Sequence, residues 1–97
     1  MNLDDTSAFA RLDAENMLAE IDALPEQLGK AWELGRQQSL PGWSDLENIV
    51  ICGLGGSAIG ADLLAAYALD RCRVPVVVHR DYDLPAWAGD RRTLVIA

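Results

Sequence analysis

The chain has 97 residues, of which 51% are hydrophobic and 24% charged, and its 8 Lys and Arg against 15 Asp and Glu give a formal net charge of −7. This composition is typical of one small globular domain or part of a larger one, and it excludes a disordered or collagen-like chain. A net negative charge offers no basic surface for nucleic acid or an anionic membrane, so we expect neither as a partner.

The chain carries no predicted membrane span or secretory signal. Its longest uncharged stretch, residues 48–61, includes four glycines and is shorter than the roughly 20 apolar residues that cross a bilayer. The first twenty residues carry five acidic side chains, unlike the basic start and apolar core of a signal peptide. We therefore expect a cytoplasmic protein.

Cys52 and Cys72 stand twenty positions apart, with no CxxC pair and a single histidine in the chain. This spacing predicts no metal site. We expect two reduced thiols, with Cys52 acting as a small buried hydrophobe within the most apolar run.

The front of the chain predicts two helices. Met17, Leu18, Ile21 and Leu24 recur at helical spacing, and a second group with the same spacing follows Pro25. We expect Asp13 to cap the first helix and Pro25 to lie in the first turn of the second. Residues 1–42 are thus predicted to be a helical lead-in that ends at Pro41-Gly42.

The rest of the chain, residues 43–97, predicts strands around one apolar helix. Three β-branched runs at residues 49–52, 74–78 and 93–97 lack a clean polar alternation, which favours a parallel sheet covered on both faces. Residues 58–69 predict a buried helix, and residues 80–92 a loop with at most one or two helical turns. The order predicts an α/β fold, the first part of a doubly wound parallel-sheet domain preceded by two helices. Because the last strand ends at residue 97 without a covering helix, we expect the N-terminal part of a larger domain or close pairing with another copy.

A glycine-rich segment, Cys52-Gly-Leu-Gly-Gly-Ser-Ala-Ile-Gly60, leaves the first strand and opens the apolar helix. Glycines let the backbone approach a ligand closely. The first amide N–H groups of a helix, together with its dipole, favour an anion such as phosphate, and Ser57 adds a hydroxyl donor. The alternative is that the glycines only make a tight turn.

The same segment also resembles a dinucleotide fingerprint. Gly53, Gly55 and Ala58 match G-x-G-x-x-A, and Asp81 follows Gly55 by 26 positions, near the roughly 20 expected for a ribose-binding acid. Two helices precede the strand, however, whereas a dinucleotide fold usually begins with it. No lysine follows the glycines, so a Walker loop is excluded.

Three segments together resemble the opening of a sugar isomerase (SIS) domain, and most closely the bifunctional phosphoglucose/phosphomannose isomerase family. They are ENIVICGLGGSAIGADLL at 47–64, PVVVHRDYDLP at 75–85 and TLVIA at 93–97, and ALPEQL at 23–28 resembles the family's lead-in. The resemblance implies a cofactor-free aldose–ketose isomerase that interconverts glucose 6-phosphate or mannose 6-phosphate with fructose 6-phosphate through an enediol. It also implies a homodimer when the chain is complete.

The resemblance further implies the site residues. Gly56 and Ser57 match the family's substrate-contacting Gly-Ser, and Gly55 shapes the turn. The family's Ser/Thr-rich phosphate loop and its acid/base Glu, His and Lys lie beyond residue 97. No residue here matches a catalytic position, so we expect the 97 residues to be inactive by themselves.

Several other residues have weaker predictions. His79 is expected to be a surface or supporting residue rather than the base, and Arg80-Asp81 a paired turn near the site. Trp32, Trp43 and Trp87 are expected to be core or interface anchors. The alternatives to an isomerase are a non-catalytic SIS module that binds a sugar phosphate or dimerises, and an NAD(P)-binding domain.

Overall fold

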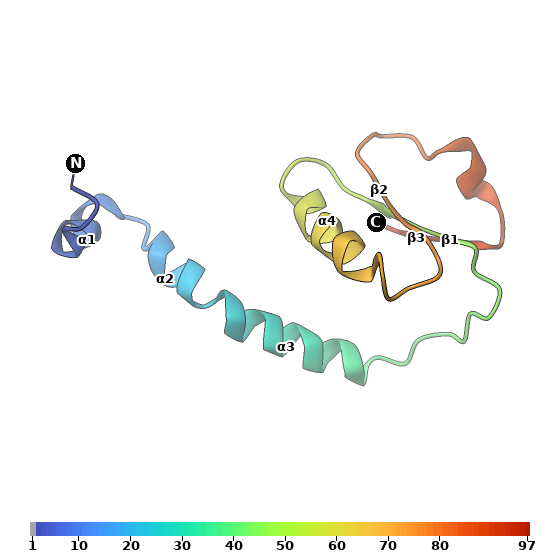
Figure 1. Ribbon diagram of the computed structural model, residues 1–97, viewed down its shortest axis with the longest axis horizontal. Coiled ribbons are helices and arrows are strands. Elements are labelled where there is room, and N and C mark those ends of the chain that lie inside the picture. Colours follow the sequence, from blue (N-terminus) through green and yellow to red (C-terminus); the bar gives the residue numbers. More distant parts are fainter. Residues whose placement is uncertain (1) are drawn as a thin grey trace. The chain divides into compact units, whose positions relative to one another are not determined.

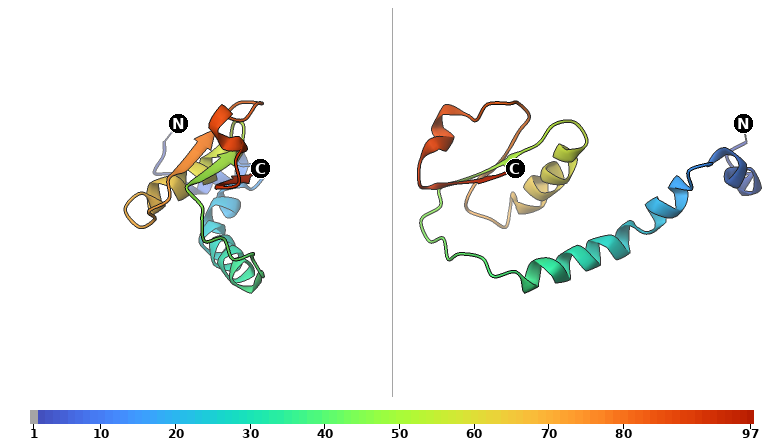
Figure 2. Two further views of the ribbon diagram at one scale, coloured as in Figure 1. Left: turned by 90° about the vertical axis from the view of Figure 1, so that its right-hand side faces the viewer. Right: turned by 180° about the vertical axis from the view of Figure 1, so that it is seen from behind.

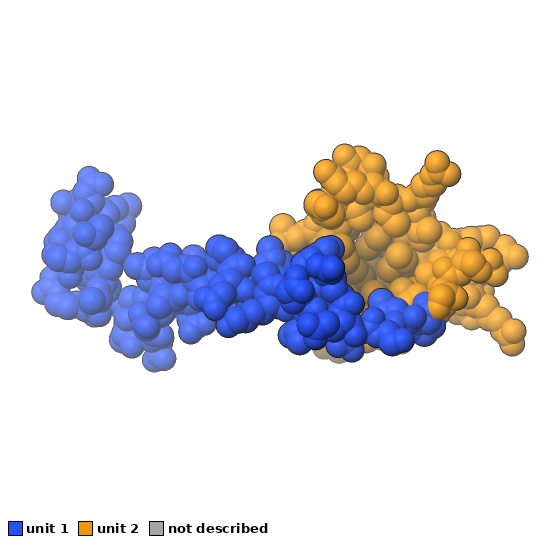
Figure 3. Space-filling view, turned by 90° about the horizontal axis from the view of Figure 1, so that it is seen from below, with its two compact units in different colours: residues 1–41 blue, residues 42–97 orange. Residues whose placement is uncertain are grey.

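A computed structural model describes residues 2–97. The chain divides into two compact units, residues 1–41 and 42–97, which Figure 3 distinguishes by colour. Each unit is described separately below.

The first unit is helical. A short 3-10 helix, η1 (Thr6–Ala8), and α1 (Phe9–Leu12) precede α2 (Met17–Asp22) and α3 (Leu24–Gln37). The two predicted helices are therefore α2 and α3, whereas η1 and α1 were not predicted.

Two sequence features explain where α2 and α3 begin. The Asp13 carboxylate accepts hydrogen bonds from the backbone N–H groups of Met17 and Leu18, each at 2.7 Å. It thereby satisfies two amides that have no partner within the helix. Pro25 lies in the first turn of α3, where its missing N–H costs no helical hydrogen bond. Both predictions are confirmed.

None of residues 2–41 is buried. The apolar stripe of α3 is largely solvent-exposed, with Leu28 at 73% and Trp32 at 68% exposure. Trp32 is therefore not a core residue, and the prediction that it anchors a core is wrong for the described chain. A 14-residue helix with a charged opposite face keeps its amphipathic pattern without a partner element in this unit.

The second unit has an α/β fold, as the sequence predicts. Along the chain it comprises β1 (Asn48–Cys52), α4 (Ser57–Ala68), β2 (Val76–His79), η2 (Ala86–Gly89) and β3 (Thr93–Ile96). The three strands form a parallel sheet in the order β2-β1-β3. Figures 1 and 2 show α4 beside the strands, and it contacts β2 and β1.

The core of this unit is small and lies around the central strand. Val50, in the middle of β1, is fully buried and pairs in register with Val77 of β2 and Val95 of β3. Ala58, Ala61 and Ala88 are also buried. A strand paired on both sides has no exposed edge, which is why the deepest residue lies in β1.

The prediction that α4 is a buried helix is wrong. Its least exposed positions are alanines at helical spacing, Ala58, Ala61, Ala65 and Ala68. Its large apolar side chains are exposed, at 59% for Ile59, 69% for Leu63 and 65% for Tyr67. The small residues allow close packing on the sheet, so the large ones occupy the remaining faces of the helix.

Other predictions on burial also need correction. Cys52 is half-buried rather than buried, although both cysteines are free as predicted. Trp43 and Trp87 are 49% and 46% exposed, so neither is a core residue. Over residues 2–97, no helix has the length and apolar character needed to cross a membrane.

Candidate functional site

The candidate site is the turn of residues 53–56, which connects the carboxyl end of β1 to the first residue of α4. The Gly53 amide donates to the carbonyl oxygen of His79 at 3.1 Å, which continues the pairing of β1 with β2 by one residue. The turn therefore begins at a fixed place beside the end of β2. In a parallel sheet, the carboxyl ends of the strands lie at one edge, where open α/β folds bind their ligands.

Two glycines are needed for different reasons. Gly55 has a φ of +56°, in the left-handed region that L side chains rarely adopt. A Cβ at Gly53 would lie 3.3 Å from both the Ala58 amide nitrogen and the Ser57 Oγ, so this position packs closely against the start of α4. Gly56 has ordinary helical dihedrals, and a Cβ there would meet open space.

The free amides of the turn are those of Gly55 and Gly56, for which the described residues provide no hydrogen-bond partner. The next three amides, of residues 57–59, donate to the carbonyl oxygens of residues 54–56 at 3.2–3.3 Å. The prediction that the first amides of the helix point outward unpaired is therefore wrong from Ser57 onward, because tight i→i−3 bonds satisfy them. Two adjacent N–H groups remain for an anion.

The Ser57 hydroxyl closes the turn on itself. Its Oγ donates to the Leu54 carbonyl oxygen at 2.6 Å and accepts from the Leu54 amide at 3.2 Å. A hydroxyl has one proton to donate, so a ligand can receive it only if the bond to Leu54 breaks. The role of Ser57 as a donor to phosphate remains a prediction, whereas its role in the turn is observed.

His79 ends β2 and fixes the loop that follows. Its Nε2 forms a hydrogen bond with the carbonyl oxygen of Asp83. A carbonyl oxygen only accepts, so Nε2 carries the proton. This nitrogen is therefore not available as a base, in agreement with the supporting role predicted for His79.

Arg80 pairs with Asp62 of α4 and not, as predicted, with its neighbour Asp81. The Asp81 carboxylate instead accepts from the Tyr82 amide at 2.8 Å. The helix brings Asp62 beside the end of β2, across eighteen positions of sequence. The sequence did contain a signal for this pair, because Asp62 is the only charged side chain on α4.

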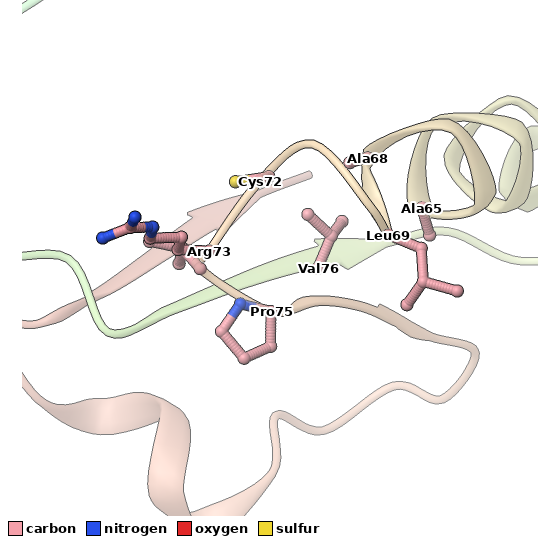
Figure 4. A pocket seen from close by; sticks show the side chains of 8 residues that line it. Ala65, Ala68, Leu69, Cys72, Arg73, Pro75 and Val76 are labelled. Atoms are coloured by element: carbon pink, nitrogen blue, oxygen red, sulfur yellow. The ribbon is translucent and has the colours of Figure 1, made fainter.

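A separate hollow of about 260 Å³ lies between the last turn of α4 and the start of β2. Figure 4 shows Ala65, Ala68, Cys72 and Val76 around it. It lies at the amino end of β2, whereas the glycine turn follows the carboxyl end of β1. The hollow is therefore not part of the candidate site. Residues 2–97 also contain no cluster of three or more His, Cys, Asp or Glu side chains that could hold a metal ion.

The strand order separates two of the readings of the glycine turn. In the classic dinucleotide fold, the third strand pairs with the second, whereas here β3 pairs with β1. The order β2-β1-β3 is that of the flavodoxin-like arrangement, in which the switch point lies between the first and third strands. The fingerprint formed by Gly53, Gly55 and Ala58 thus lies in a different topology from that of the dinucleotide-binding fold.

Comparison with known proteins gives one informative match. The bifunctional phosphoglucose/phosphomannose isomerase of Caldicellulosiruptor bescii is 50% identical to this chain over 82 residues. The match covers 84% of the chain but 24% of that protein, so the chain spans about a quarter of the length of its curated relative. No protein-family model matches the chain, and no solved structure does.

Proposed function

We propose that this chain forms part of an aldose–ketose isomerase that interconverts glucose 6-phosphate or mannose 6-phosphate with fructose 6-phosphate. The observation that carries the proposal is the 50% identity over 82 residues to a bifunctional phosphoglucose/phosphomannose isomerase. Identity at this level extends over both units of the chain, because 82 residues exceed the length of either one. In this proposal the second unit is the opening of an SIS domain, and the complete protein is a cytoplasmic homodimer.

The role proposed for the glycine turn is to bind the phosphorylated sugar through Gly55, Gly56 and Ser57. The unpaired amides of Gly55 and Gly56 support this role, because neighbouring N–H groups at a helix start favour an anionic oxygen. Gly55 holds the turn in a shape that a residue with a side chain would strain. The three residues thus orient the substrate.

The chemistry proposed is proton transfer between adjacent carbons of the sugar through an enediol. It needs a base that removes the proton beside the carbonyl and returns it to the next carbon, and no redox cofactor. The histidine nearest the turn in the sheet has its Nε2 engaged with the Asp83 carbonyl. We therefore assign no catalytic residue within the 97 positions and expect them to bind substrate without turning it over.

The experiment compares the 97-residue chain with the complete product of its gene, whether or not that product is longer. Isomerisation of fructose 6-phosphate is followed by NMR, and binding is measured by titration calorimetry. We expect turnover by a complete isomerase, and binding of fructose 6-phosphate but no turnover by the 97 residues. Unphosphorylated fructose is the matched control and should bind far more weakly, because it lacks the anion.

Two results would decide against this proposal. Binding of fructose 6-phosphate by the complete product, with no isomerisation of any of the three sugar phosphates, would favour a non-catalytic sugar-phosphate module. Binding of NAD(H) or NADP(H), with none of fructose 6-phosphate, would instead favour a dinucleotide-binding domain.

A further inference from the structure

The carboxyl edge of the sheet holds one cation and several anions. Of the five arginines in residues 42–97, Arg80 is the one that directly follows a strand. Arg71 and Arg73 precede β2, and Arg91 and Arg92 precede β3, which places them toward the opposite edge of a parallel sheet. The loop after β2 adds Asp81 and Asp83 to the carboxyl edge.

Arg80 is also adjacent to the glycine turn. Cys52 pairs in register with His79, and the Gly53 amide bonds to the His79 carbonyl oxygen. Arg80 is therefore the residue of β2's chain beside the first residues of the turn. Neighbouring strands lie about 4.8 Å apart, a spacing that an extended arginine side chain exceeds.

The partner of Arg80 in the free protein is exposed. The ion pair joins the guanidinium to the Asp62 carboxylate, and each side chain is 47% exposed. Exposed ion pairs contribute little to stability, so stability gives a weak reason for the only charge on α4. A guanidinium has five N–H donors, and a half-exposed one can exchange a carboxylate for another anion.

We propose that Arg80 is the cation that binds the phosphoryl group at the glycine turn, and that Asp62 holds it in the free protein. This inference rests on the function proposed above, because it concerns the same anion. The two free amides of Gly55 and Gly56 carry only partial charges, and the surrounding carboxylates of Asp62 and Asp81 disfavour an anion. Arg80 supplies the full positive charge that offsets them.

The test compares two variants that break the same ion pair. Arg80→Ala removes the cation, whereas Asp62→Ala removes its competitor and leaves the cation free. Dissociation constants for fructose 6-phosphate and for inorganic phosphate are measured by calorimetry in the complete gene product. We expect Arg80→Ala to weaken both by about tenfold, the loss typical of one charge-assisted contact, and Asp62→Ala to bind as tightly as the parent or more tightly.

Two further variants serve as controls. Arg92→Ala removes the same charge from an exposed pair with Glu47 near the start of β3, and it should leave both dissociation constants unchanged. Arg80→Lys keeps the charge and should recover part of the affinity. Thermal unfolding of each variant shows whether the fold is retained, and if Arg80→Ala does not fold, the comparison between Arg80→Lys and the parent is used in its place.

The outcomes separate this inference from the proposed function. If the parent protein binds no sugar phosphate, both fail. If the parent binds and Arg80→Ala binds equally well, the inference alone is overturned. Equal weakening by Arg80→Ala and Asp62→Ala would also overturn it, because a purely structural pair loses the same contact in either variant.

Discussion

The left-handed conformation of Gly55 leads to a quantitative prediction about two adjacent glycines. In both Gly55→Ala and Gly56→Ala, the new Cβ meets no atom within 4 Å, so the two substitutions differ in backbone conformation and not in crowding. Gly55 has a φ of +56°, and Gly56 has a φ of −61° and a ψ of −29°. The pair therefore isolates the cost of the left-handed region.

The magnitude follows from two opposing terms. Alanine in the left-handed region costs roughly 1–2 kcal/mol. Replacing glycine by alanine also restricts the unfolded chain and stabilises the fold by about 0.4–1 kcal/mol, and this gain applies to both positions. We expect Gly56→Ala to be slightly stabilising, and Gly55→Ala to be about 1–2 kcal/mol less stable than Gly56→Ala.

Urea unfolding followed by circular dichroism measures this difference, and thermal unfolding gives a second estimate. In a chain of this size, 1 kcal/mol corresponds to roughly 4–8 °C in Tm, so the two variants should be clearly separated. Equal stabilities, or a Gly55→Ala protein more stable than Gly56→Ala, would show that the turn does not depend on a left-handed glycine.

Three further substitutions test other features. Ser57→Ala removes both hydrogen bonds with Leu54 and should lower the free energy of unfolding by about 1 kcal/mol; an unchanged value in urea unfolding would contradict the closed turn. Asp13→Ala removes the acceptor for two amides of α2 and should cost about 1 kcal/mol of helix stability, read as increased amide hydrogen exchange at the start of α2. Val50→Ala in the fully buried core should cost roughly 1–3 kcal/mol, whereas Val95→Ala, at 38% exposure, should cost less than Val50→Ala; similar losses would argue against a core centred on β1.

The strands and helices of the second unit could be predicted because their signals are local. A β-branched run such as residues 49–52 disfavours helix, and an alanine- and leucine-rich run such as 58–69 favours it. Glycine at position 55 was expected where the backbone bends sharply, and its φ of +56° provides the reason. The predicted phosphate site at this turn remains a prediction that only a binding measurement can test.

The errors share one physical cause, which is that burial and pairing depend on elements distant in sequence. An apolar helix looks buried from its composition, but only the packed structure shows that α4 presents alanines to the sheet and leaves Leu63 exposed. Arg80 and Asp81 look like a pair because they are adjacent, but α4 places Asp62 beside the arginine instead.

The sequence by itself determined the element order, the caps at Asp13 and Pro25, and the glycine turn after the first strand, since each depends on the backbone preferences of a few neighbouring residues. The tertiary structure alone decided the strand order β2-β1-β3, the two amides left free in the turn, and the partner of Arg80. These features arise from hydrogen bonds and charges brought together across the sheet, and no local pattern encodes which of the competing partners lies closer.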